Sequence, residues 1–303
     1  MKKVMALLLA MSFMLVGCST AKKTEEMKVL TPNGAPALAL SGLYEEVSKN
    51  GEFKIVEGSD LLTSEFVKDD GEYDVIVAPI NLGCQLIAKG QTDYRLAGVL
   101  TWGNLYLVEN VDVNNQQLAA FGQQAVPGKI FNIVKDSSDL MKNSQATYFN
   151  AVSDVQAQLI SGKYQYGLMA EPAATATIAK AKQNNVTLKI VASLQDVYQQ
   201  KMESDESGYP QAAVFVKDQK NTKDFLSKLD TFTNVDAIKE DNNIEELIDQ
   251  IGAEIFGVPS ATIASKTWTN QNIHYKDASK VKDDITSLLA QFNIEFSDDM
   301  IIQ

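Results

Sequence analysis

The feature that most constrains the fold is a repeated unit, in which a short β-type run leads through a proline-containing or small-residue turn into a helix-like segment. A proline in the first turn of a helix costs no hydrogen bond, because the first amides have no partner within the helix. Strands that alternate with helices at this spacing predict a parallel sheet covered by helices on both faces. The units comprise residues 27–48, 73–89, 118–135 and 166–182.

The length of the chain allows one large domain or two lobes. It has 303 residues, of which 45% are hydrophobic and 8% aromatic, so there is enough apolar material for substantial cores. Two long apolar runs, over residues 95–108 and 210–216, stand apart from the repeated units. We interpret them as two crossings between lobes, with Gly103 and residues 208–210 as hinges.

This interpretation divides the chain into lobes. The final part is predicted to be helical over residues 222–229, 244–251, 260–266 and 280–292. We expect the first lobe to comprise residues 27–103 and 213–303, and the second lobe residues 104–212.

The N-terminus has the pattern of an export signal. Two lysines precede an apolar run over residues 4–16, which is too short to span a bilayer comfortably. The run ends in Leu15-Val16-Gly17-Cys18, which is similar to the lipobox of bacterial lipoproteins. We expect a signal peptide (1–17), a lipid-bearing Cys18, a short tether (18–26) and a location on the outer face of the cell membrane. The alternative is an ordinary secretory leader with a chance cysteine.

Composition excludes some functions. The net charge of −12 argues against a nucleic-acid partner, because phosphate binding needs a basic surface. With Cys18 lipidated, Cys84 has no partner for an intramolecular disulfide, and its apolar surroundings predict a buried small hydrophobe. The acidic stretch 240–249 is most simply a solvated helix face. Arg95 and His274 are the only arginine and the only histidine in the sequence.

Several motifs together resemble the substrate-binding proteins of ABC importers, in the branch that includes nitrate, sulfonate, taurine and thiamine-precursor binders. They are Gly34-Ala-Pro-Ala-Leu-Ala-Leu40, Asp74-Val-Ile-Val-Ala-Pro79, Ala170-Glu171-Pro172, and Leu194-Gln-Asp with Tyr209-Pro-Gln211. The resemblance implies an α/β fold of the type II-like periplasmic-binding-protein kind. Each of its two lobes has a mixed sheet flanked by helices, and two hinge strands join the lobes. It also implies a monomer that traps a small molecule between the lobes and delivers it to a permease with ATPase subunits.

Ligands of open α/β sheets bind beyond the carboxyl ends of the strands, where loops lead into helix N-termini with free amides. In these loops we expect hydrogen-bonding side chains, an aromatic platform, a carboxylate acceptor and glycines that allow close backbone approach. The candidates are Asn33, Asn81 and Gln124 as hydrogen-bonding groups, Trp102 as a stacking platform, Glu171 as an acceptor, and Gly34 and Gly103 as the glycines.

Each candidate also has a purely structural interpretation. Asn33 and Gly34 form a common turn dipeptide, and Asn81 is a suitable helix N-cap. Trp102 is equally suited to fill the interface between the lobes. A carboxylate such as Glu171 ahead of a helix is stabilised by the helix dipole without any ligand.

The shortage of arginine bears on the ligand. Sulfonates, carboxylates and phosphates are commonly held by the two-pronged arginine side chain, and we expect Arg95 to begin a strand at the end away from the cleft. Helix N-termini or Lys129 could still hold an anion. The balance favours a neutral or cationic heterocycle, such as a pyrimidine vitamin precursor, with a sulfonate or taurine as the alternative.

Two other function classes remain open. Thiamine-pyrimidine synthases share this fold but use histidine and a lysine-bound pyridoxal phosphate, and His274 alone supplies that chemistry poorly. We find no Ser-His-Asp set, metal-ligand cluster or phosphate-binding glycine loop, so we expect no catalysis, cofactor or metal. The other alternative is a sensory lipoprotein that binds a ligand without serving an importer.

Overall fold

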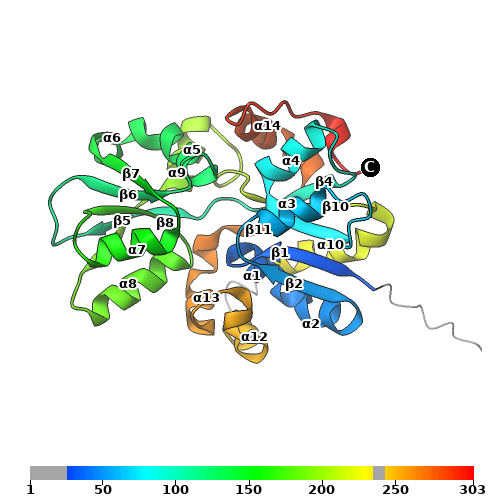
Figure 1. The fold of residues 1–303 in the computed structure, drawn as a ribbon, viewed down its shortest axis with the longest axis horizontal. Helices are drawn as coiled ribbons and strands as arrows, with labels where there is room; N and C mark the ends of the chain where they lie inside the picture. Colours follow the sequence, from blue (N-terminus) through cyan, green and yellow to red (C-terminus); the bar gives the residue numbers. More distant parts are fainter. Residues whose placement is uncertain (1–25, 235–242) are drawn as a thin grey trace, which may run out of the picture.

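The computed structural model describes residues 26–234 and 243–303. The expected signal peptide, Cys18 and nearly all of the tether lie outside these ranges, as does the beginning of the acidic stretch. Two lobes lie side by side in Figure 1, each built around one sheet. No helix among the described residues combines the length and the apolar character needed to span a bilayer.

The first lobe contains a mixed six-stranded sheet in the order β11-β4-β10-β3-β1-β2. Neighbouring strands β1, β2 and β3 run parallel, whereas β10 is antiparallel to β3 and β4, and β11 is antiparallel to β4. The strands are β1 (Lys28–Pro32), β2 (Glu52–Val56), β3 (Val75–Pro79), β4 (Arg95–Thr101), β10 (Ala212–Val216) and β11 (Ile273–Asp277). The helices of this part of the chain are α1 (Ala35–Ala39), α2 (Ser41–Asn50), α3 (Asp60–Phe66), α4 (Ile80–Ala88), α10 (Gln219–Asn234), α12 (Asn243–Ile251), α13 (Ala261–Thr267) and α14 (Lys282–Ala290).

The second lobe contains a mixed five-stranded sheet in the order β7-β6-β8-β5-β9. Here β6 runs parallel to β7 and β8, and β5 is antiparallel to β8 and β9. The strands are β5 (Leu105–Asn110), β6 (Gln117–Phe121), β7 (Gln145–Phe149), β8 (Tyr166–Ala170) and β9 (Leu188–Ser193). The helices are α5 (Val126–Val134), α6 (Asp139–Asn143), α7 (Val152–Ile160), α8 (Ala173–Gln183) and α9 (Leu194–Met202).

The central strands are apolar because helices cover both of their faces. In β3 and β10 nearly every side chain is buried, so continuous runs of valine, isoleucine and alanine replace the alternating pattern of a half-exposed strand. Cys84 on α4 is buried in the same core, and burial raises the pKa of its thiol to about 12. The prediction of a buried small hydrophobe at Cys84 is therefore confirmed.

The chain passes between the two sheets at residues 102–104 and returns at residues 203–211. The apolar run 95–108 is therefore not one strand, because β4 ends at Thr101 and β5 begins at Leu105. The two crossings touch, since the Tyr209 amide donates a hydrogen bond to the Trp102 carbonyl over 3.1 Å. At Gly103 the backbone has a φ of +91°, and a Cβ there would lie 2.6 Å from the Tyr209 ring.

Gly208, on the return crossing, gives a prediction about stability. Its φ is +100°, and a Cβ at this position would lie 2.0 Å from the carbonyl oxygen of Trp102. Because both backbone strain and a backbone clash oppose a side chain, we expect Gly208→Ala to lower the free energy of unfolding by about 3 kcal/mol. Gly90 is the matched control, because its φ of +62° is also left-handed but a Cβ would meet nothing within 4 Å. Urea unfolding should show Gly90→Ala losing only about 1 kcal/mol. Equal losses in the two variants would show that the crossings are not tightly packed here.

Candidate functional site

A cavity of about 540 Å³ lies between the two lobes. This volume suits a small molecule. Its walls come from the carboxyl ends of β1, β6 and β8, from the first turns of α7 and α8, and from the two crossings. The lining residues are Asn33, Gly34, Ala35, Pro36, Asn104, Phe121, Val152, Ser153, Gln156, Met169, Ala170, Glu171, Pro172, Ala173, Ala176, Thr177, Gln211, Gly257 and Pro259.

Two of the predicted residues form part of the first-lobe wall. Asn33 and Gly34 follow β1 directly, and their amides donate hydrogen bonds to the carbonyls of Val56 (2.9 Å) and Phe256 (2.8 Å). Gly34 has a φ of +81°, which favours glycine at this turn. These bonds fix the backbone of the turn, from which Asn33 lines the cavity.

Glu171 contributes a carboxylate from the second lobe. It follows β8, is 2% exposed, and accepts hydrogen bonds from the Thr175 amide (3.0 Å, Oε2) and the Thr175 hydroxyl (2.7 Å, Oε1). The side chain therefore satisfies the first turn of α8 in the manner of a cap. Burial raises the pKa of the Glu171 carboxyl, and hydrogen bonds from Thr175 and Asn270 oppose that rise.

Asn104 and Gln211 connect the two crossings on the same cavity. The Asn104 side-chain amide donates to the Glu171 carbonyl over 2.7 Å, and the Glu171 amide donates to the Asn104 carbonyl over 2.9 Å. Gln211 Nε2 in turn donates to Asn104 Oδ1 over 3.0 Å. A residue on the return crossing is thus linked through the first crossing to the end of β8.

The raised pKa of Glu171 leads to a pH prediction. The folded state binds the proton more tightly than the unfolded chain, so the contribution of Glu171 to stability is full below its ordinary value of 4.5 and is lost as the pH rises through the folded pKa. We expect Glu171→Gln to reduce the fall in the thermal unfolding midpoint above about pH 4.5. Thermal unfolding of both proteins across a pH series measures this difference. If the unfolding midpoints of the two proteins changed in parallel with pH, the raised pKa of Glu171 would be contradicted.

The other predicted residues do not line the cavity. Asn81 lies on α4, and its Oδ1 is buried without a hydrogen-bond partner among the described residues. Gln124 is exposed in the turn before α5. Trp102 is fully buried, donates from Nε1 to the His274 carbonyl over 3.0 Å, and stacks on the His274 ring at 5.3 Å. The expected stacking platform is therefore an interior residue of the junction, covered by β11.

Sequence reasoning missed Asn104, Gln211 and the polar pair Ser153 and Gln156 on α7. Gln211 belongs to the Tyr209-Pro-Gln motif, and Asn104 directly follows the hinge glycine, so their positions at the crossings were available as a signal. Ser153 and Gln156 belong to a helix that the repeated pattern did not reveal.

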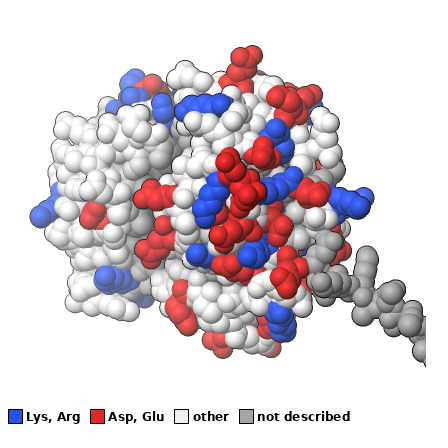
Figure 2. All heavy atoms as spheres, turned by 45° about the vertical axis from the view of Figure 1, so that its right-hand side comes forward, with Lys and Arg blue, Asp and Glu red and all other residues white. Residues whose placement is uncertain are grey.

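The described wall of the cavity carries negative charge and no positive charge. Of the described residues that line it, none is a lysine, arginine or histidine, and Glu171 is the one carboxylate. Arg95 begins β4, and its side chain donates to the carbonyls of Thr92 and Tyr94. Charged side chains of both signs gather instead on the outer face of the first lobe, while the second lobe is mostly uncharged in that view (Figure 2). The cavity can thus hold a small molecule by hydrogen bonds and apolar contact.

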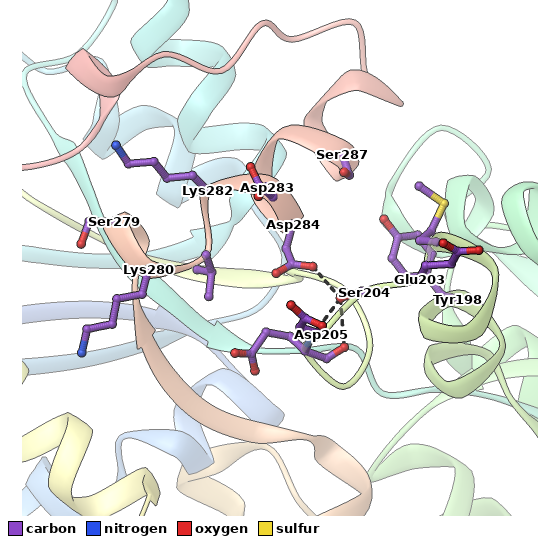
Figure 3. Close-up of a pocket in the computed structure, with 13 residues that line it drawn as sticks. Tyr198, Glu203, Ser204, Asp205, Ser279, Lys280, Lys282, Asp283, Asp284 and Ser287 are labelled. Atoms are coloured by element: carbon purple, nitrogen blue, oxygen red, sulfur yellow. Dashed lines mark hydrogen bonds between the residues drawn. The ribbon is translucent and has the colours of Figure 1, made fainter.

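A second cavity of about 560 Å³ lies where the return crossing meets the start of α14 (Figure 3). Its walls carry five acidic side chains and two lysines, and Ser204 donates a hydrogen bond to Asp284 over 2.5 Å across it. Burial raises the pKa of Asp284, helped by the neighbouring carboxylates of Glu206, Asp205 and Asp283. This cavity is similar in size to the first but lies away from the carboxyl ends of the parallel strands, so we take the first cavity as the candidate site.

Solved structures of similar fold were found, although no protein-family model and no curated protein sequence matches the chain. An ABC transporter protein from Parabacteroides distasonis is 22% identical, with a TM-score of 0.73 over 88% of this chain and 91% of that one. The chain has the fold of ABC-importer substrate-binding proteins.

Two further structures support this. The periplasmic aliphatic sulphonate binding protein of Escherichia coli is 13% identical, with a TM-score of 0.61 over 88% of this chain and 84% of that one. A putative nitrate transport protein from Thermoplasma volcanium is 13% identical, with a TM-score of 0.53 over 89% of this chain and 96% of that one. The expected two-lobed fold with mixed sheets is confirmed.

Proposed function

We propose that this protein is the solute-binding component of an ABC importer, working outside the cytoplasmic membrane. The observation that carries the proposal is the cavity of about 540 Å³ whose polar groups come from both lobes and from both crossings. A ligand that contacts both lobes favours the conformation in which they are close together. The ligand-loaded form then docks on a permease with ATPase subunits, and the solute is released without chemical change.

The favoured ligand is a neutral or cationic heterocycle, such as a pyrimidine vitamin precursor. An anionic ligand would lie close to the Glu171 carboxylate with no basic side chain on the cavity wall to offset the repulsion. The alternative is a sulfonate or taurine, and the names of three structures of similar fold, which refer to sulfonate binding, support the sulfonate class.

Calorimetry against hydroxymethylpyrimidine, taurine and an alkanesulfonate tests the ligand. Binding of the heterocycle alone supports the favoured class, and binding of a sulfonate alone replaces it with the alternative. Recovery of the bound molecule unaltered, checked by mass spectrometry, distinguishes a binding protein from an enzyme of the same fold. Loss of uptake when the gene is deleted distinguishes an importer component from a sensory lipoprotein.

The proposed location on the outer face of the cell membrane depends on Cys18. In this proposal Cys18 carries the acyl chains that anchor the monomer through a short tether. A Cys18→Ser variant should leave the membrane fraction and be found free of lipid. The same membrane association in the variant and the unaltered protein would remove the lipid anchor from the proposal and leave solute binding untouched.

A further inference from the structure

We infer that the ligand of the cavity presents an N–H donor to Gln211 Oε1, and that it therefore belongs to the class of amines, amidines or amino-substituted heterocycles. The inference rests on the proposed solute-binding function and makes Gln211 a specificity-determining residue. It is carried by a chain of hydrogen bonds that allows only one orientation of each amide involved.

The orientation of the amides begins at the Glu171 backbone carbonyl, which can only accept a hydrogen bond. The group of Asn104 that lies 2.7 Å from it must therefore be the donor Nδ2. This turns Asn104 Oδ1, an acceptor, toward Gln211, so the group of Gln211 at 3.0 Å must be the donor Nε2. The Gln211 carbonyl oxygen is then the end of the side chain left for another partner.

The remaining oxygen has no partner in the described protein. Gln211 lines the cavity, and its Oε1 is buried with no hydrogen bond. A buried acceptor without a donor has lost its hydrogen bonds to water and is therefore unfavourable. A ligand that supplies the donor removes this cost, whereas a ligand that can only accept increases it.

The one carboxylate on the described cavity wall, Glu171, has the same preference for a donor. Glu171 is an acceptor when ionised, and none of the described lining residues is a lysine, arginine or histidine that could attract an oxyanion. Asn104 and Gln211 lie on the crossings, and Asn104 is hydrogen-bonded to the Glu171 backbone, so these preferences act in one part of the cavity. The oxygens of a sulfonate or nitrate group there would face the acceptor oxygens of Gln211 and Glu171 and could not hydrogen-bond to them. An amino group could donate hydrogen bonds to the same oxygens.

The test uses four compounds and two variants. Calorimetry compares hydroxymethylpyrimidine bearing its ring amino group with the analogue that has a methyl group in that place, and also measures taurine and an alkanesulfonate. The variant is Gln211→Met, which keeps the length of the side chain and removes both polar ends. The control is Gln85→Met, the same change at an exposed position on α4. Thermal unfolding confirms that each variant is folded.

We expect the amino compound to bind the unaltered protein and the Gln85→Met variant equally, and to bind Gln211→Met about tenfold more weakly. The methyl analogue should bind weakly to all three proteins and show no dependence on Gln211. Sulfonate or taurine binding without binding of the amino compound would overturn the donor inference and leave solute binding standing. Equal affinity of the amino compound for Gln211→Met and the unaltered protein would also overturn it. Failure of every compound to bind would overturn both proposals.

Discussion

Replacing Ala176 with tryptophan should weaken ligand binding by more than about 100-fold while the protein stays folded. Ala176 lies on α8, lines the cavity and is partly buried, so an indole at this position occupies space that the ligand needs. Ala179 on the same helix is exposed and does not line the cavity. Ala179→Trp is therefore the matched control and should bind as the unaltered protein does.

Calorimetry with the compound that binds the unaltered protein measures the effect, and thermal unfolding shows whether both variants are folded. Unchanged affinity in Ala176→Trp would mean that the ligand binds elsewhere, with the charged cavity beside α14 as the next place to test. A loss of affinity in both variants would indicate that the substitutions disturb α8, and not that the tryptophan blocks the cavity.

Replacing Trp102 with alanine should lower the free energy of unfolding by about 3–5 kcal/mol. The indole is 0% exposed, stacks on His274 and donates to the His274 carbonyl, so its removal leaves a void and takes this donor away. Trp102→Phe keeps an aromatic ring and loses the donor, and should cost about 1 kcal/mol. Urea unfolding followed by circular dichroism measures both losses.

The Trp102→Ala variant also distinguishes the two interpretations of Trp102, as a ligand platform and as an interior residue. A ligand platform predicts weak binding and nearly unchanged stability, whereas an interior residue predicts lost stability and, under conditions where the variant is folded, an affinity within about threefold of the original. Weak binding with unchanged stability would return Trp102 to the cavity wall.

The central strands could be predicted from the sequence, because burial on both faces leaves continuous apolar runs. The run 73–78 followed by Pro79 corresponds closely to β3 and the start of α4. Edge strands could not be predicted. In β2 and β7 the side chains are exposed or half-buried, and polar and apolar residues alternate over only four positions, the shortest stretch from which a strand is recognised.

The first helical segment is divided where the sequence pattern did not predict a division. The helical pattern over residues 37–48, within the first repeated unit, predicted one helix, but the chain forms α1 and α2 with Leu40 between them. Leu40 is fully buried, and the local signal for the break is the Ser41-Gly42 pair that follows it directly, which the surrounding apolar pattern obscures.

The candidate site also contains residues that the sequence could place and residues that it could not. Asn33, Gly34 and Glu171 follow strands that are apparent in the sequence, and all three line the candidate cavity at the carboxyl ends of those strands. Asn104 and Gln211 are 107 residues apart, and their hydrogen bond depends on the meeting of the two crossings. Trp102 does not line this cavity, because β11, which the sequence pattern did not reveal, covers it.

The central claim is that two lobes close on an unaltered small molecule. Small-angle X-ray scattering, with and without saturating amounts of hydroxymethylpyrimidine, taurine or an alkanesulfonate, tests it most directly when paired with calorimetry. We predict that the compound that binds also reduces the radius of gyration, and that it is recovered chemically unchanged. A bound compound that leaves the radius of gyration the same would contradict the claim.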